Sequence, residues 1–208
     1  MTTSTYLTVA RPGDAEIEVK RSRFLGHVER VADEEQARQV VERIRRERWD
    51  ARHHCSAFVL GPDAALQRSS DDGEPSGTAG APMLEVLRGH EVSDVVAVVT
   101  RYFGGTLLGA GGLVRAYSDA VRAALEDAGT LSRRLEDRFA ITVGHAEAGR
   151  LENDLRAHGV HVLGSDYAAE VTLHVSLPAG PDRLSGLLAE LTGGSTAAVH
   201  LGSGWVDG

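Results

Sequence analysis

The sequence predicts an α+β protein built from two domains. Its 208 residues are enough for one large domain or two small ones, and contents of 42% hydrophobic and 25% charged residues are ordinary for a globular protein. Short alternating or β-branched runs are interspersed with segments whose apolar residues recur every three or four positions. The order of these segments changes near Leu135, so we place the first domain at 1–130 and the second at 136–208.

The first domain is predicted to start with two strands and a helix. Residues 15–31 alternate well enough to indicate two strands around Lys20–Arg23. Asp33 is a plausible N-cap for the helix that follows. The apolar face of that helix consists of Ala37, Val40, Val41 and Ile44.

A hairpin, a short helix and a buried strand are predicted next. His53–Gly61 is a strand that would pair with Ala64–Ser69 across a Gly-Pro-Asp turn. Ala81–Gly89 is a short helix that Pro82 would start near its first position. In the strand Val92–Phe103, a nearly continuous β-branched run is typical of a strand covered on both faces.

The last helix of the first domain has a long apolar face and is expected to stop at Gly129. That face comprises Leu113, Ala116, Tyr117, Ala120, Val121, Ala124 and Leu125. Together these elements predict an α/β sandwich with the helices on one side of a sheet.

The second domain is predicted to have the order strand, helix, strand, strand, helix, strand. The six elements fall at residues 138–144, 148–159, 160–167, 169–178, 181–193 and 195–206. The helices would offer the sheet Leu151, Leu155 and Ala157 from the first, and Leu184, Leu187, Leu188 and Leu191 from the second. This βαββαβ order is the ferredoxin-like pattern.

Charge and cysteine content limit the class of protein. The net charge of −8 argues against a generally basic nucleic-acid-binding protein. Residues 1–135 carry −2 and residues 136–208 carry −6, so any contact with a polyanion is expected in the first part. The single cysteine, Cys55, fits a reducing compartment. Without an apolar run for a signal peptide or a membrane span, we expect a cytoplasmic protein with no membrane partner.

Two glycine-rich segments, Ser70–Gly80 and Thr100–Tyr117, are the strongest functional candidates. Each also carries charge, and loops on a rigid scaffold are where function usually lies. In the first segment, Asp71, Asp72 and Glu74 could form an acid/base set or bind a hard cation, or they could simply form a tight turn. Ser76 and Thr78 could cap the helix that begins near Ala81.

His53, His54 and Cys55 are adjacent on a predicted strand. Alternation sends His53 and Cys55 to one face and His54 to the other, so the three cannot bind one metal ion from a regular strand. No metal-binding spacing occurs elsewhere, and we expect neither a metal nor a cofactor. Cys55 could be a nucleophile with a histidine base, but a buried cysteine acting as a small apolar residue is the favoured interpretation.

Arg101 ends the buried strand, and the glycine loop after it leads into a helix whose free N–H groups would attract anions. The P-loop lysine and a G-x-G-x-x-G motif are absent, which leaves a generic anion or an RNA phosphate as candidates. Alternatively, the glycines allow close packing and Arg101 pairs with Asp71 or Asp72. The candidate binding residues are His53, His54, Asp71, Asp72, Glu74, Ser76, Gly77, Thr78, Thr100, Arg101, Tyr102, Phe103, Gly104, Gly105 and Arg115.

Four segments closely resemble the YigZ/Impact family. They are KRSRFLGHV at Lys20–Val28, HHCSAF at His53–Phe58, SDDGEPSGTAGAPML at Ser70–Leu84 and VVTRYFGGTLLGAGGLVRAYSDA at Val98–Ala120. The resemblance covers about residues 15–128, and the second domain matches in position and pattern. Departures are small: Ser56 and Phe58 stand where aromatic residues are frequent, and Ala81 stands where a basic residue is common.

The resemblance implies a fold and a field of function. It implies a ribosomal protein S5 domain 2-like fold for the first domain, and for the second a ferredoxin-like domain similar to one in elongation factor G. Eukaryotic Impact is linked to control of translation initiation, through competition for an activator of a stress kinase. Bacterial members have no settled activity. Some carry a proline-dipeptidase label, for which this sequence offers no dinuclear metal ligand set.

Two functional hypotheses follow. The first is a non-catalytic, translation-associated regulator that binds RNA, a ribosomal component or a regulatory protein. The second is a hydrolase or transferase acting on a small anionic substrate, with His54 or Asp72 as the base and Arg101 as the anion clamp. The enzyme gains support if these side chains and Glu74 converge in one pocket, and it loses support if a buried ion pair occupies Arg101.

Overall fold

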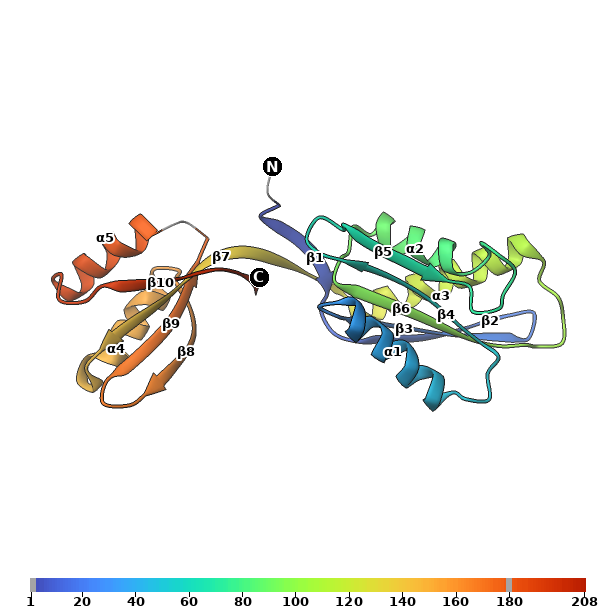
Figure 1. Ribbon diagram of the computed structural model, residues 1–208, viewed down its shortest axis with the longest axis horizontal. Coiled ribbons are helices and arrows are strands. Elements are labelled where there is room, and N and C mark those ends of the chain that lie inside the picture. Colours follow the sequence, from blue (N-terminus) through green and yellow to red (C-terminus); the bar gives the residue numbers. More distant parts are fainter. Residues whose placement is uncertain (1–2, 179–180) are drawn as a thin grey trace. The chain divides into compact units, whose positions relative to one another are not determined.

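A computed structural model describes residues 3–178 and 181–208, without the side chain of Pro181. The chain divides into two compact units, Met1–Arg133 and Arg134–Gly208 (Figure 1). The strands are β1 (Thr5–Val9), β2 (Gly13–Val19), β3 (Ser22–Arg30), β4 (His53–Leu60), β5 (Leu66–Ser70), β6 (Val95–Tyr102), β7 (Thr130–Val143), β8 (His161–Tyr167), β9 (Val171–Leu177) and β10 (Ala198–Asp207). The helices are α1 (Glu34–Glu47), α2 (Gly80–Gly89), α3 (Ala110–Ala128), α4 (His145–Ala157) and α5 (Pro181–Thr192).

The N-terminal unit is built on a five-stranded sheet in the order β2-β3-β6-β4-β5. The pairs β2–β3, β3–β6, β4–β6 and β4–β5 are all antiparallel. In this register Arg101, near the end of β6, lies between Phe24 on β3 and His53 on β4. Strand β6 therefore brings Arg101, from the second glycine-rich segment, next to β3 and β4 at one end of the sheet.

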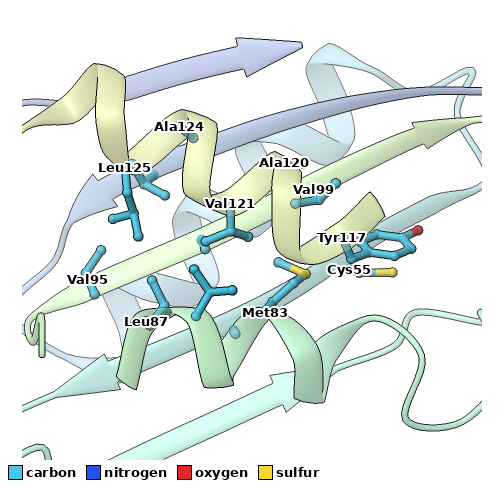
Figure 2. Packing of buried hydrophobic residues seen from close by; sticks show 14 of the residues in the cluster. Cys55, Met83, Leu87, Val95, Val99, Tyr117, Ala120, Val121, Ala124 and Leu125 are labelled. Atoms are coloured by element: carbon cyan, nitrogen blue, oxygen red, sulfur yellow. The ribbon is translucent and has the colours of Figure 1, made fainter. Parts of the chain in front are cut away.

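Helices cover both faces of this sheet, so the expectation that they lie on one side was wrong. On one face, α2 and α3 pack over Val95, Ala97 and Val99 of β6, as Figure 2 shows for part of that cluster. On the other face, α1 packs over Val96 and Val98. The residues of β6 from Val95 to Val99 are fully buried because each face has its own core, which confirms that the strand is covered on both sides.

Helix α3 lies directly on β2 and β3 because glycines stand beneath it. A Cβ atom on Gly26 would lie 2.5 Å from the carbonyl oxygen of Ala120, and one on Gly13 would lie 2.4 Å from that of Ala124. The helix meets these glycines with alanines on its buried face. Small residues on both sides thus set a close helix-to-sheet distance.

The ends of the helices confirm two sequence predictions and correct a third. Asp33 is the N-cap of α1 and accepts a hydrogen bond from the N–H of Gln36. Gly129 ends α3 with φ of +64°, a left-handed conformation that favours glycine. Helix α2 begins at Gly80, one residue before the predicted start, so Pro82 is its third residue and not its second.

The C-terminal unit has the predicted element order βαββαβ, with the sheet order β10-β7-β9-β8. Alternate residues of β7 and β9 join both helices in one core. Leu151 and Leu155 of α4 and Leu184 and Leu188 of α5 are buried there, as predicted. Ala157 is exposed, contrary to expectation, because two residues after Leu155 is about 200° around the helix, away from the buried face that Leu151 and Leu155 share.

Strand β7 begins eight residues before the predicted strand at 138–144. Its first residues belong to the N-terminal unit, where β1 pairs with β7. Next to these strands, the N–H of Ala10 donates to the carbonyl of Gly129, and Arg133 donates to the hydroxyl of Tyr6. Pairing with β1 extends β7 toward its N-terminal end. The sequence did not predict β1, and for that reason the predicted strand began too late. In the part of the chain that the structure describes, no helix is long and apolar enough to cross a membrane.

Candidate functional site

Asp71 caps helix α2 from nine residues away. Its carboxylate accepts hydrogen bonds from the backbone N–H groups of Gly77, Ala79 and Gly80, at 2.8, 3.0 and 2.8 Å. Burial by itself would raise the pKa of Asp71, but these N–H groups lower that pKa below its usual value. The expectation that Ser76 or Thr78 caps the helix was therefore wrong, and the hydroxyl of Thr78 donates to the carbonyl of Pro75 instead.

Asp72 ties the same loop to β4 and α1. Its carboxylate accepts from the N–H of His54 at 2.7 Å and from Arg45 at 3.0 Å. Its carbonyl oxygen accepts from Nδ1 of His53 at 2.9 Å. The carboxylate and the carbonyl oxygen of Asp72 are thus engaged in bonds within the protein.

Glu74 and Arg101 form a buried ion pair. Nη1 of Arg101 donates to Oε1 of Glu74 at 2.7 Å, and the side chains are 8% and 3% exposed. The hydroxyl of Tyr117 donates to the same oxygen, also at 2.7 Å, and burial raises the pKa of Tyr117. The expected partner of Arg101, Asp71 or Asp72, was wrong. Arg101 lies on the same face of β6 as Val95, Ala97 and Val99, which is the face that α3 covers. Glu74 lies on that face too, where it contacts Tyr117 of α3.

The three adjacent residues of β4 separate as alternation predicts. Cys55 is fully buried in the α2–α3 core, its Sγ donates to the carbonyl of Asp71, and burial raises its pKa to about 12. His54 is buried beside Thr100, 3.1 Å from Nδ1 to Oγ1, and burial lowers its pKa. Cys55 thus behaves as a small apolar residue and is held as a thiol at neutral pH.

His53 keeps one free acceptor. A carbonyl oxygen can only accept, so Nδ1 of His53 carries the proton that it donates to Asp72. Its Nε2 then presents a lone pair in the neutral ring. Within the described residues Nε2 has no hydrogen-bond partner.

The second glycine loop contacts the β2–β3 turn. A Cβ atom on Gly104 would lie 2.0 Å from the carbonyl carbon of Arg21, and the N–H of Gly104 donates to the hydroxyl of Ser22. Gly105 has a left-handed φ of +82°. These two predicted binding residues therefore shape the loop, whereas Arg115 is an exposed residue on α3.

A pocket of about 520 Å³ opens where β4 begins and β6 ends. We call it the Phe103 pocket. It is lined by Asp50, Ala51, Arg52, His53, Arg101, Tyr102, Phe103 and Leu107. Phe103 is 57% and Leu107 83% exposed, and the guanidinium carbon of Arg101 lies 5.6 Å from the ring centroid of Phe103. The hydroxyl of Tyr102 donates to Asp50 at 2.9 Å.

The pocket gathers only part of the predicted set. It brings together His53, Arg101, Tyr102 and Phe103. Its lining does not include His54, Asp71, Asp72, Glu74, Ser76, Gly77, Thr78, Thr100, Gly104, Gly105 or Arg115. Sequence reasoning missed Asp50, Ala51, Arg52 and Leu107. Leu107 could have been suspected as an apolar residue in a glycine loop, but the others carry no signal. Among residues 3–178 and 181–208, no three His, Cys, Asp or Glu side chains are placed to hold a metal ion.

Comparison with known proteins identifies relatives that match most of the chain. The Impact N-terminal domain matches residues 20–125, and a domain of unknown function (DUF1949) matches residues 141–195. The chain is 46% identical over 151 residues to IMPACT family member YvyE of Bacillus subtilis, covering 73% of this chain and 70% of that protein. It is 41% identical over 193 residues to IMPACT family member YigZ of Escherichia coli, covering 91% and 95%. A crystal structure of a hypothetical protein superimposes with a TM-score of 0.66 at 38% identity, covering 95% of this chain and 98% of that one.

Proposed function

Since this chain belongs to the IMPACT family, we propose that it is a non-catalytic regulator associated with translation. It would bind RNA, a ribosomal component or a protein partner through the surface around the Phe103 pocket. One observation carries the proposal. Asp71, Asp72 and Glu74 of the first glycine-rich loop bond to other parts of the protein, whereas the side chains left exposed at the pocket are apolar or cationic and are available to a partner. Phe103 and Leu107 are largely exposed, and Arg52 is an exposed cation at the same pocket.

The hydrolase or transferase alternative lacks a comparable observation. It needs a base and an anion clamp within reach of one substrate. His54 contacts Thr100, Asp72 binds Arg45, and Glu74 occupies one end of Arg101. Of the four residues named for the enzyme, Arg101 alone lines the Phe103 pocket.

We also propose that the two compact units are two domains with the folds that the family resemblance implies. A ferredoxin-like fold for the C-terminal unit is supported by the element order βαββαβ and the sheet order β10-β7-β9-β8. A ribosomal protein S5 domain 2-like fold is the corresponding proposal for the N-terminal unit. The cytoplasm is the proposed location, and the argument rests on the single cysteine.

Translation itself provides the test. The purified chain would be added to a cell-free translation system, with its sedimentation alongside ribosomal particles and initiation factors and the rate of initiation as the two readouts. We expect the chain to co-sediment with a ribosomal particle or an initiation factor and to change the rate of initiation. Arg68→Gln, which alters an exposed cation on β5 outside the pocket, serves as the matched control for pocket variants. A chain that neither co-sediments nor changes initiation would overturn the proposed function.

A further inference from the structure

We propose that the Phe103 pocket binds an unpaired nucleotide of single-stranded RNA. This inference rests on the proposed function and chooses one ligand class among those it allows. Four features of the pocket and its rim support it: a buried guanidinium with a donor left over, an exposed aromatic ring, a free histidine acceptor and a group of cations without carboxylate partners.

Arg101 offers a donor that the protein does not use. The residue is 7% exposed, and Glu74 accepts from Nη1. Nε is buried without a hydrogen-bond partner in the described chain. A buried N–H without an acceptor costs free energy, and an anionic oxygen forms a strong, charge-assisted bond with a guanidinium. A phosphate oxygen entering the pocket would supply the missing acceptor.

Phe103 offers a surface on which a base can stack. Its ring is more than half exposed, although the guanidinium of Arg101 lies near it. Leu107 and Tyr102 extend the apolar lining of the same pocket. Stacking of unpaired bases on aromatic side chains is a common way for proteins to bind single strands, and a base inside a duplex cannot reach such a ring.

His53 favours a nucleotide over a simple anion. Its Nδ1 donates to the carbonyl of Asp72, so Nε2 is an acceptor when the ring is neutral. A phosphodiester or a carboxylate presents only acceptors at neutral pH and gains nothing from Nε2 of the neutral ring. The N–H groups of a base and the ribose 2′-hydroxyl are donors that would suit it.

The cations around the pocket favour a polyanion over a single carboxylate. Arg52 lines the pocket, and Lys20, Arg21 and Arg52 are exposed and form no ion pair among the described residues. Lys20 and Arg21 make the β2–β3 turn with φ of +48° and +64°, a conformation that is costly for residues with a side chain. This turn contacts Gly104, the residue directly after Phe103. A basic turn beside an aromatic pocket matches the groove-and-stack arrangement of single-strand binding.

The test is direct binding of the full chain to a short, unstructured, fluorescently labelled oligouridine, measured by anisotropy across a range of salt concentrations. We expect Phe103→Ala to weaken binding about fivefold or more, which is the lower end of the effect of losing one stacked base. Arg52→Gln should reduce the slope of log affinity against log salt by about 0.7, the value for one phosphate contact with a single strand. Arg68→Gln should bind as the wild type does, and thermal unfolding would show that each variant is folded.

Several results would overturn the inference. They are equal binding by Phe103→Ala, equal binding of the corresponding duplex RNA, and competition by uridine monophosphate at the same concentration as the oligonucleotide. Preference for an acidic peptide over RNA would also overturn it. If RNA does not bind but the chain still co-sediments with ribosomal particles or factors and changes initiation, this inference fails and the proposed function stands. If RNA binds as expected but the chain neither co-sediments with ribosomal particles or factors nor changes initiation, the pocket assignment stands and the proposed function fails.

Discussion

Arg101, which the sequence suggested as an anion-binding residue, forms a buried ion pair with Glu74. Both charges are buried, and Tyr117 donates to the same carboxylate oxygen. Breaking such a pair leaves a buried charge uncompensated, whereas replacing both partners with apolar groups is often neutral. The pair therefore makes the N-terminal core sensitive to single substitutions at either end.

Glu74→Gln is expected to lower the free energy of unfolding by about 3–5 kcal/mol, because Arg101 stays charged and buried. Adding Arg101→Met should recover much of that loss. Urea denaturation would measure both variants. Glu85→Gln is the control, since its pair with Arg88 is exposed and is expected to contribute about 0–1 kcal/mol. A cost for Glu74→Gln no larger than that of the control would contradict the buried-pair interpretation.

Asp71 should stabilise the fold in a pH-dependent way. Its pKa is lowered in the folded state, so its contribution is present above the unfolded-state value of about 3.9 and is lost as the pH falls through the lower folded-state value. Asp71→Ala is expected to cost about 1–2 kcal/mol at neutral pH, as loss of an N-cap does. The difference in unfolding free energy between wild type and variant should shrink below about pH 4. A difference that is constant from neutral to acid pH would refute this role.

Cys55 is expected to be unreactive in the folded protein. Burial raises its pKa to about 12, so the thiolate is scarce at pH 8 and reagent has no access to the sulfur. Iodoacetamide should leave the native chain unmodified and should label it fully in denaturant, as followed by mass spectrometry. Labelling of the native chain at the rate of a free thiol would show that Cys55 is accessible after all.

At the scale of elements, the contact of α3 with β2 and β3 depends on glycine. Gly26→Ala would place a Cβ atom 2.5 Å from the carbonyl oxygen of Ala120, so the helix must move or strain must remain. We expect a loss of about 1–3 kcal/mol in unfolding free energy, the usual cost of overpacking.

Gly149→Ala in α4 is the matched control for Gly26→Ala. Its added Cβ atom meets nothing within 4 Å, and alanine is a better helix former than glycine by about 0.5–1 kcal/mol. The two substitutions make the same chemical change, so opposite signs in urea denaturation would separate packing from helix propensity. No loss of unfolding free energy for Gly26→Ala would mean that α3 does not depend on the close approach.

The helices and strands were largely predictable from the sequence, but the face of the sheet on which each helix packs was not. Asp33 and the apolar face of α3 are local signals within one helix, and the structure confirms both. The placement of α1 opposite α2 and α3 was missed, although the β-branched run of β6 already required cover on both faces. Periodicity identifies which face of a helix is buried, and it does not identify which face of the sheet receives that helix.

At the scale of the whole molecule, each compact unit has its own core. The cluster around Phe139 and Leu173 is separate from those that cover the sheet of the N-terminal unit. We expect two unfolding transitions in scanning calorimetry, because units with separate cores can unfold separately. Gly26→Ala should lower the temperature of one transition and leave the other in place. A single transition that Gly26→Ala shifts as a whole would contradict independent units.

The sequence by itself determined the order and type of the elements other than β1, the two family-defining loops and the identity of most residues in the cores. These depend on interactions between near neighbours and on long specific motifs, which can be recognised without coordinates. Only the tertiary structure decided that Arg101 pairs with Glu74, that Asp71 caps α2 and that Phe103, Leu107 and Arg52 border one pocket. These partners come from different strands, loops and helices, and strand register together with helix docking brings them within reach. Such contacts result from the packing of whole elements, so no local pattern in the chain could specify them.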